Sequence, residues 1–237
     1  MKNSSTRELV LLSVLSALVI FLCFITTVVP MPSGLNITFS LIPLAIAAIA
    51  LGVKGGTIVG AVFGLVSFLQ CFGIIGTSGM GAALFNEAKS FKTVILLFVQ
   101  RFIPRLIDGA LLGLIFKWLS IPLKEKRVRL LNAEGETTGY VVTREEKRLN
   151  LYSRCAVTGF CAAFINTALF MSALVLLFGS YDYMKKAIAG RAFFAYVIAS
   201  VGINGLVEMI VTPILVGTIG YALYKSGHLK NIELMEK

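Results

Sequence analysis

Charged residues are scarce in this chain. Asp, Glu, Lys and Arg make up 14% of its 237 residues, well below the roughly 25% of soluble domains. It has one histidine, and its four cysteines include no C-x-x-C pair, which excludes the usual zinc and redox motifs. Few groups remain for acid–base catalysis. We therefore expect no catalytic residue, no metal and no cofactor.

Motifs for nucleotides and nucleic acids are also missing. No segment matches the phosphate-binding loop G-x-x-x-x-G-K-[ST], so we do not expect the chain to hydrolyse a nucleotide. The net charge of +10 comes from basic residues between apolar runs. Because no basic helix is interleaved with aromatic residues, a nucleic-acid partner is not indicated.

Hydrophobic residues make up 57% of the chain, which is typical of an integral membrane protein. A helix needs about 20 apolar residues to cross the hydrocarbon core. Lys54, Gly55 and Gly56 predict a tight turn between two short runs. The sequence predicts one all-α membrane domain over 1–237, a bundle of six transmembrane helices. Their ranges are about 9–29, 37–53, 55–73, 93–119, 153–179 and 192–224.

The distribution of basic residues predicts the topology. Most of the 22 Lys and Arg residues lie in the two termini, at Lys54 and in the segment 117–153. Positively charged connections stay on the cytoplasmic side. We therefore expect a multi-pass protein of the plasma membrane with both termini cytoplasmic.

The segment 121–151 is a cytoplasmic insertion in this scheme. Two short β-prone runs flank the sequence Asn-Ala-Glu-Gly at 132–135, which suits a small hairpin. The insertion is either a solvated linker or a contact for a cytoplasmic partner, and the sequence leaves both open.

Three ionisable residues, Arg101, Arg105 and Asp108, interrupt the apolar run VQRFIPRLIDGALLGLIF. Each costs roughly 2.5 to 3.5 kcal/mol at the centre of a bilayer. At about 100° per residue the three positions fall within about 60° of one another, so they share a helix face. This pattern predicts a polar lining inside the bundle, where a substrate can bind.

Small residues recur at four-residue spacing. Gly56, Gly60 and Gly64 have this spacing, which lets helices approach closely in lipid. Ser13 and Ala17 in the first predicted span have the same spacing. That pair either packs within the bundle or faces another protein.

Two segments resemble a known family. The stretch ITFSLIPLAIAAIALGVKGGTIVGAVFGLVSF, residues 37–68, is similar to the second and third helices of the substrate-binding S components of energy-coupling factor (ECF) vitamin transporters. The segment FIPRLIDGALLGLIFKWL, residues 102–119, resembles the fourth helix of these proteins, nearest to the pantothenate-type members.

This resemblance implies a vitamin-binding subunit and not an enzyme. Such a subunit captures a small-molecule vitamin near the outer face, then joins a transmembrane coupling subunit and two ATP-binding-cassette ATPases that drive uptake. In the family, small residues on the first helix contact the coupling subunit, and the matching positions here are Ser13 and Ala17.

The ligand is expected at Arg101. Arg101 is nearer than Arg105 to the predicted outer end of its helix, and a guanidinium binds a carboxylate through two hydrogen bonds. Pantothenate is therefore favoured. Arg105 and Asp108, three residues apart, are expected to form a buried ion pair, with Glu208 as a further partner of Arg105. Other polar candidates for the ligand site are Asn166, Asn204, Ser67, Gln70 and Asn86.

Other functions stay open. Riboflavin and folate are alternative vitamins. A small stand-alone secondary transporter is a different class, but such proteins usually contain repeated halves, which this sequence lacks. A membrane enzyme would need a nucleophile or paired carboxylates, and Asp108 and Glu208 each have a cation nearby in sequence or in the expected fold.

Overall fold

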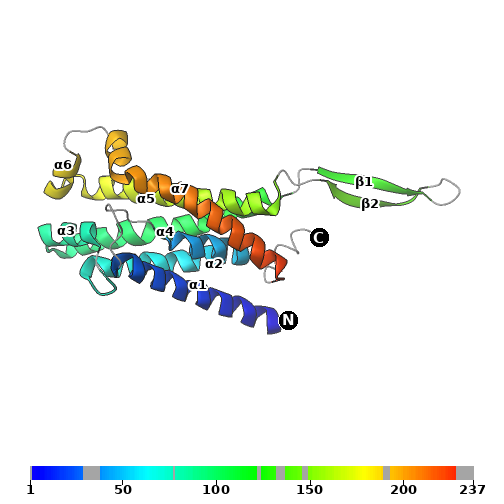
Figure 1. Cartoon of the computed structure of the whole chain (residues 1–237), viewed down its shortest axis with the longest axis horizontal. Coiled ribbons are helices and arrows are strands. Elements are labelled where there is room, and N and C mark those ends of the chain that lie inside the picture. The colour runs from blue at the N-terminus through cyan, green and yellow to red at the C-terminus, as the bar shows by residue number, and fades with distance from the viewer. Residues whose placement is uncertain are drawn as a thin grey trace.

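Helices dominate the architecture. The computed structural model describes residues 2–28, 38–76, 78–121, 124–131, 137–145, 149–188 and 193–227. Five long helices lie side by side in an elongated bundle (Figure 1). The elements are α1 (Lys2–Val28), α2 (Leu41–Leu69), the 3-10 turn η2 (Gln70–Phe72), α3 (Gly79–Glu87), α4 (Phe91–Leu119), β1 (Lys124–Leu131), β2 (Thr137–Glu145), α5 (Leu151–Phe178), α6 (Asp182–Ile188) and α7 (Phe193–Lys225).

Four of the described helices are long and apolar enough to cross a membrane, and they lie in α1, α2 with η2, α5 and α7. The prediction of a helical bundle with helices able to cross a membrane is confirmed for these four. Helix α4 has 29 residues and is also long enough to cross a membrane. It differs from these four helices because it contains more ionisable residues. It lies between α2 and α5 (Figure 1), with its ionisable residues buried and an apolar stripe that includes Ile95, Ile103 and Leu114 exposed.

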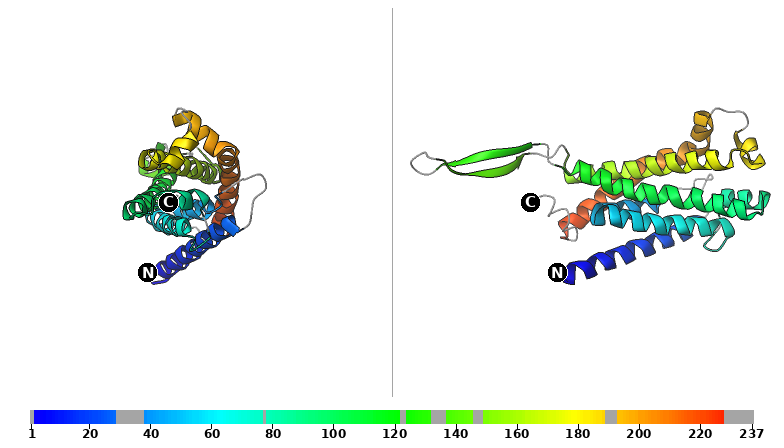
Figure 2. Two further views of the ribbon diagram at one scale, coloured as in Figure 1. Left: turned by 90° about the vertical axis from the view of Figure 1, so that its left-hand side faces the viewer. Right: turned by 180° about the vertical axis from the view of Figure 1, so that it is seen from behind.

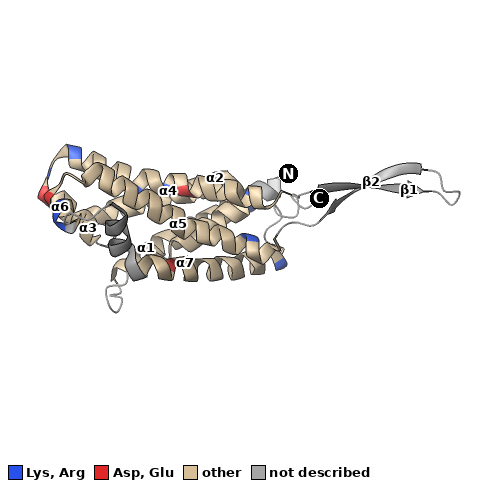
Figure 3. Ribbon diagram, turned by 90° about the horizontal axis from the view of Figure 1, so that it is seen from above, with Lys and Arg blue, Asp and Glu red and all other residues tan. Residues whose placement is uncertain are grey.

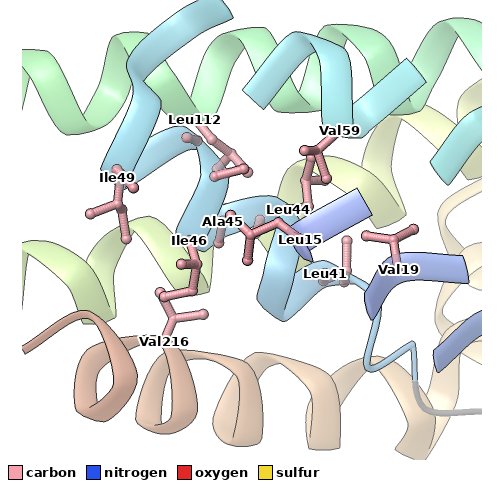
Figure 4. Packing of buried hydrophobic residues seen from close by; sticks show 14 of the residues in the cluster. Leu15, Val19, Leu41, Leu44, Ala45, Ile46, Ile49, Val59, Leu112 and Val216 are labelled. Carbon is pink, nitrogen blue, oxygen red and sulfur yellow. The ribbon is translucent and has the colours of Figure 1, made fainter. Parts of the chain in front are cut away.

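The chain reverses direction within α2. Gly52 has φ 66° and ψ −157°, a conformation that glycine adopts without steric penalty. A Cβ atom on Gly56 would lie 3.0 Å from the Cβ of Ala48, whereas eight residues of straight helix span about 12 Å. The two arms, 41–51 and 53–69, therefore lie side by side, as Figure 4 shows. The predicted turn at Lys54 to Gly56 is wrong by a few residues, because the left-handed conformation falls on Gly52.

The second arm of α2 packs directly on the backbone of α4. A Cβ atom on Gly60 would overlap the carbonyl oxygen of Arg105, and one on Gly64 would lie 2.8 Å from the Cα of Phe102. Glycine at these positions lets the two helices approach to backbone contact. This contact fixes the rotation of α4 and thus the direction of its charged face.

The first arm of α2 forms the centre of the apolar core. Nearly all of its residues are buried, and the surrounding cluster draws on α1, α5 and α7 (Figure 4). A second cluster joins α3, α4, α5 and α6 and includes Leu84, Leu97 and Phe178. The bundle therefore has two apolar layers along its length.

The two ends of the bundle differ. The start of α1 and the end of α7 meet where Arg7 Nη2 donates a hydrogen bond to the carbonyl oxygen of Gly227, at 2.9 Å. The strands β1 and β2 project from this same end, which we call the hairpin end (Figures 1 and 2). The opposite end carries α3 and α6, and we call it the cover end. Lys and Arg concentrate at the two ends (Figure 3).

Strands β1 and β2 form an antiparallel hairpin within the 121–151 segment. Their pairing runs from Lys124 with Glu145 to Leu130 with Gly139, and the register shifts between Leu130 and Leu131. The hairpin extends beyond the helices (Figure 2). An isolated two-stranded hairpin is at best marginally stable in water.

Replacing Gly60 tests the backbone contact between α2 and α4. We expect Gly60→Ala to lower stability by about 1 to 3 kcal/mol, because the new methyl group must push the carbonyl of Arg105 away. Thermal unfolding of the detergent-solubilised protein measures the effect. The control is Gly79→Ala, since nothing lies within 4 Å of a Cβ atom there. Equal midpoints for the two variants would contradict the close packing.

Candidate ligand-binding site

The charged face of α4 points into the bundle. Arg101, Arg105 and Asp108 are 5%, 6% and 0% exposed. Their shared face follows from the helical spacing, and the contact of the adjoining backbone of α4 with α2 sets its direction. The polar cluster lies between α2, α4 and α5, with α3 above it at the cover end.

Arg101 lies directly below the start of α3. Its Nη2 donates to the hydroxyl of Ser78, at 3.0 Å, and that hydroxyl also caps α3 by accepting from the backbone N–H of Gly81. A Cβ atom on Gly81 would lie 3.1 Å from the same Nη2. The absence of a side chain at Gly81 therefore lets α3 begin against the guanidinium.

The start of α3 adds positive potential beside Arg101. In the described part of the chain no hydrogen bond is made by the backbone N–H groups of Gly79 and Met80, the first two residues of the helix. The N-terminus of a helix carries a partial positive charge and readily binds anions. Arg101 and these N–H groups together form a region suited to a carboxylate.

Arg105 is held by two aromatic rings. Its guanidinium carbon lies 4.5 Å from the ring centroid of Phe63 in α2 and 5.0 Å from that of Phe170 in α5. Its Nη1 donates to the carbonyl oxygen of Arg101, at 3.0 Å. The guanidinium of Arg101 lies 4.9 Å from the same Phe170 ring. Phe170 therefore joins the two arginines through cation–π contacts.

The predicted ion pair between Arg105 and Asp108 is not formed. Neither carboxylate oxygen of Asp108 has a hydrogen-bond partner. The reason is the direction of long side chains in a helix, which lean toward its N-terminus. Arg105 reaches back to the carbonyl of Arg101, one turn earlier, and so turns away from Asp108, which lies one turn later.

Glu208 has a backbone group as its hydrogen-bond partner. Its Oε1 accepts from the N–H of Thr38, at 2.6 Å. The carboxylate lies within electrostatic range of Arg105, but the two groups do not form the direct ion pair that we predicted. Glu208 instead fastens α7 to the start of the segment that leads into α2.

Several buried polar atoms in this region have no hydrogen-bond partner. An unsatisfied buried polar group costs about 1 to 3 kcal/mol, so native proteins usually supply a ligand or an ordered water. Their concentration on α4 and α5 makes the cluster a candidate binding site. These atoms are both amide atoms of Gln100, Nε of Arg101, Nε of Arg105, both carboxylate oxygens of Asp108 and Oδ1 of Asn166.

The other predicted site residues fall into different places. Asn166 is buried in α5 one turn from Phe170, and Ser67 is buried in α2. Gln70 donates from Nε2 to the carbonyl oxygen of Cys23, at 3.0 Å, and so ties η2 to α1. Asn204 is half-buried in α7, one turn before Glu208.

Asn86 is exposed near the end of α3 and lies outside the buried cluster. Four residues of the site were not anticipated: Gln100, Phe63, Phe170 and Ser78. Gln100 is a polar residue inside an apolar run, and this pattern in the sequence could have identified it as a candidate site residue. The two phenylalanines resemble many others in the sequence, and nothing in the sequence distinguishes Ser78 as the cap that meets Arg101.

Comparison with known proteins identifies the family. The family model described as ECF transporter, substrate-specific component, matches residues 7–220. The chain belongs to this family. This S component is therefore a subunit of a membrane transporter, and its family is not one of enzymes.

The S component is also similar to the pantothenate transporter PanT of Leuconostoc mesenteroides. The two are 26% identical over 229 residues, which cover 94% of this chain and 95% of the relative. The resemblance seen in residues 37–68 and 102–119 thus extends over nearly the whole chain.

A carboxylate clamp holds the cover end together. Glu87 at the end of α3 accepts hydrogen bonds from the backbone N–H groups of Asp182, at 2.6 Å, and Tyr183, at 3.0 Å. These groups begin α6, where a negative charge is favourable. The clamp fixes α6 beside α3 and thereby steadies the cover over Arg101.

We expect Glu87→Ala to release the start of α6, because two charge-assisted hydrogen bonds are lost. Amide hydrogen exchange at Asp182 and Tyr183 should become about tenfold faster or more, from the loss of about 1.5 kcal/mol or more. Glu87→Gln is the matched control and should retain part of the protection, since its amide oxygen still accepts. Unchanged exchange in the alanine variant would show that α6 is held by other contacts.

Proposed function

We propose that this S component binds pantothenate and delivers it to partner subunits for ATP-driven uptake. The observation that carries this proposal is the environment of Arg101. Its guanidinium is buried, makes no ion pair with a carboxylate of the described residues, and lies against the N-terminus of α3. A buried cation without an acidic partner suits an anionic ligand.

The chemistry favours a carboxylate. The Nη2 of Arg101 is used by Ser78, while its Nε has no partner. A carboxylate can accept from this Nε and from the free N–H groups at the start of α3, in short charge-assisted hydrogen bonds. Pantothenate is a small monocarboxylate, and the similarity to a pantothenate transporter supports this vitamin over riboflavin and folate.

The proposed topology has six membrane crossings, with the two arms of α2 counted separately. The hairpin end, which holds the start of α1 and the end of α7, would then lie in the cytoplasm. This orientation is supported by the excess of Lys and Arg in the connections at that end. The cover end, with α3 above Arg101, would face outward in the plasma membrane, where the vitamin is captured.

The coupling subunit is proposed to dock on α1. This helix packs mainly against α2, and most of its side chains are exposed or half-buried. Ser13 and Ala17 are exposed on it. Small exposed residues with apolar neighbours let another helix approach closely. A transmembrane coupling subunit with two ATP-binding-cassette ATPases would complete the transporter.

We expect Arg101→Ala to weaken pantothenate binding by more than tenfold, because the charge-assisted hydrogen bonds to the carboxylate are lost. Isothermal titration calorimetry on the purified protein measures this affinity, with riboflavin and folate as comparison ligands. Arg101→Lys should recover only part of the loss, since an ammonium lacks the planar fork.

The control for this experiment is Lys92→Ala. Lys92 is an exposed cation on the same helix nearer its outer end, so it tests for non-specific electrostatic attraction. Equal affinities of Arg101→Ala and the unaltered protein would place the carboxylate elsewhere. Tight binding of riboflavin or folate with no response to pantothenate would overturn the proposed substrate.

We expect Ser13→Leu and Ala17→Leu to block assembly with the coupling subunit, because the larger side chains prevent close helix contact. Co-purification with a tagged coupling subunit measures assembly, and pantothenate affinity should be unchanged. Ala222→Leu is the control, since Ala222 is an exposed alanine on α7. Assembly that survives both changes on α1 would remove this face as the interface.

A further inference from the structure

Asp108 has no role in the binding of a carboxylate at Arg101. It is 0% exposed, and neither of its oxygens has a hydrogen-bond partner within the part of the chain that the structure describes. A buried carboxylate without donors is costly unless another molecule supplies them. The residue therefore requires an explanation beyond the anion site.

The helix geometry places Asp108 in line with Arg101. Seven residues of α-helix turn through nearly two full turns, so the two positions differ by about 20° in direction. The rise of about 1.5 Å per residue puts Asp108 about 10 Å closer to the hairpin end. Arg105 lies between them with a free Nε. From the cover end to the hairpin end, one face of α4 thus presents the guanidinium of Arg101, the Nε donor of Arg105 and the carboxylate of Asp108.

Helix α5 lines the same region with Phe170 and Asn166. Phe170 contacts both arginines, and Asn166 lies one turn nearer to the hairpin end on the same face of α5. One turn corresponds to about 5.4 Å, which places Asn166 near the depth of Asp108. The Oδ1 of Asn166 also has no hydrogen-bond partner. Near the hairpin end of the cluster, the oxygens of Asp108 and Oδ1 of Asn166 are therefore acceptors that no donor of the described residues satisfies.

These acceptors fit hydroxyl groups better than charged ones. A second carboxylate on the ligand would be repelled by Asp108, and a metal cation would be repelled by Arg105, which lies within electrostatic range of Asp108. A hydroxyl group donates one hydrogen bond and carries no charge. Such a group satisfies a buried carboxylate at the least electrostatic cost.

We propose that Asp108, assisted by Asn166, binds the hydroxyl groups of a ligand whose carboxylate lies at Arg101. The ligand then lies along α4 with its acidic end toward the cover end and its hydroxyl end toward the hairpin end. This inference rests on the proposed function, because Arg101 must hold the carboxylate.

The length of the ligand agrees with this arrangement. In pantothenate roughly eight bonds separate the carboxyl carbon from the terminal hydroxyl oxygen. An extended chain advances about 3.8 Å for three bonds, which gives about 10 Å. This length matches the rise between Arg101 and Asp108. The central amide carbonyl would pass Arg105 and can accept from its Nε.

Affinities of ligand analogues for the unaltered protein and for its variants test the proposal. The probes are pantothenate, an analogue in which both hydroxyls are replaced by hydrogen, and panthenol, which has an alcohol in place of the carboxylate. We expect the unaltered protein to bind the dideoxy analogue at least about tenfold more weakly than pantothenate. Asp108→Asn should weaken pantothenate about tenfold and leave the dideoxy analogue within about twofold.

Arg101→Ala is the matched variant at the other end of the site. It should weaken pantothenate and the dideoxy analogue alike but leave panthenol unchanged. If Asp108→Asn does not fold, Asn166→Ala replaces it, with the same selectivity for hydroxyl-bearing ligands expected. Thermal unfolding without ligand establishes that each variant is folded.

The outcomes separate this inference from the proposed function. Equal affinity of the unaltered protein for pantothenate and its dideoxy analogue overturns the role of Asp108, while binding of a pantothenate-type acid stands. Equal weakening of both ligands by Asp108→Asn assigns the residue a purely structural role and also overturns the inference. No binding of pantothenate at any concentration overturns the proposed function itself.

Discussion

Backbone contact between the second arm of α2 and α4 is the constraint on which the binding cluster depends. Glycines 56, 60 and 64 leave no side chain between the two helices. A helix held this closely cannot rotate without clashes. The face of α4 that adjoins this contact carries the ionisable residues, and it is thereby fixed between α2 and α5. The close packing of one face determines the position of charge on the face beside it.

Aromatic rings stabilise the charges of Arg101 and Arg105 and leave N–H groups of both side chains available for an anionic ligand. A direct ion pair with Asp108 would occupy the N–H groups that an anionic ligand needs. Phe63 and Phe170 stabilise the positive charge through their ring faces instead, and ring faces accept no directed N–H bond from the guanidinium edge. The nearby carboxylates of Asp108 and Glu208 offset the charge at longer range. The cluster thus holds two cations and two carboxylates, while Nε of both arginines and the oxygens of Asp108 have no hydrogen-bond partner among the described residues.

Much of the fold follows from sequence patterns, and the contacts within the site do not. Periodicity places Arg101, Arg105 and Asp108 on one face because helix spacing is regular. The same spacing suggested an ion pair, which the backward lean of Arg105 toward Arg101 prevents. The aromatic partners could not be chosen among the 17 phenylalanines of the chain. The turn was assigned to Gly55 and Gly56 since paired glycines are the stronger local signal, but dihedral angles decide it at Gly52.

The short segment between η2 and α3 connects the ligand site to α1. Ser78 at its end binds Arg101, and Gly76 packs so closely against Thr27 that a Cβ atom there would overlap the threonine hydroxyl. Gln70, in the preceding η2, donates to the carbonyl of Cys23. Both α1 residues lie near the end of the helix that carries the exposed Ser13 and Ala17. These contacts join Arg101 to α1 directly, without passing through the core of the bundle.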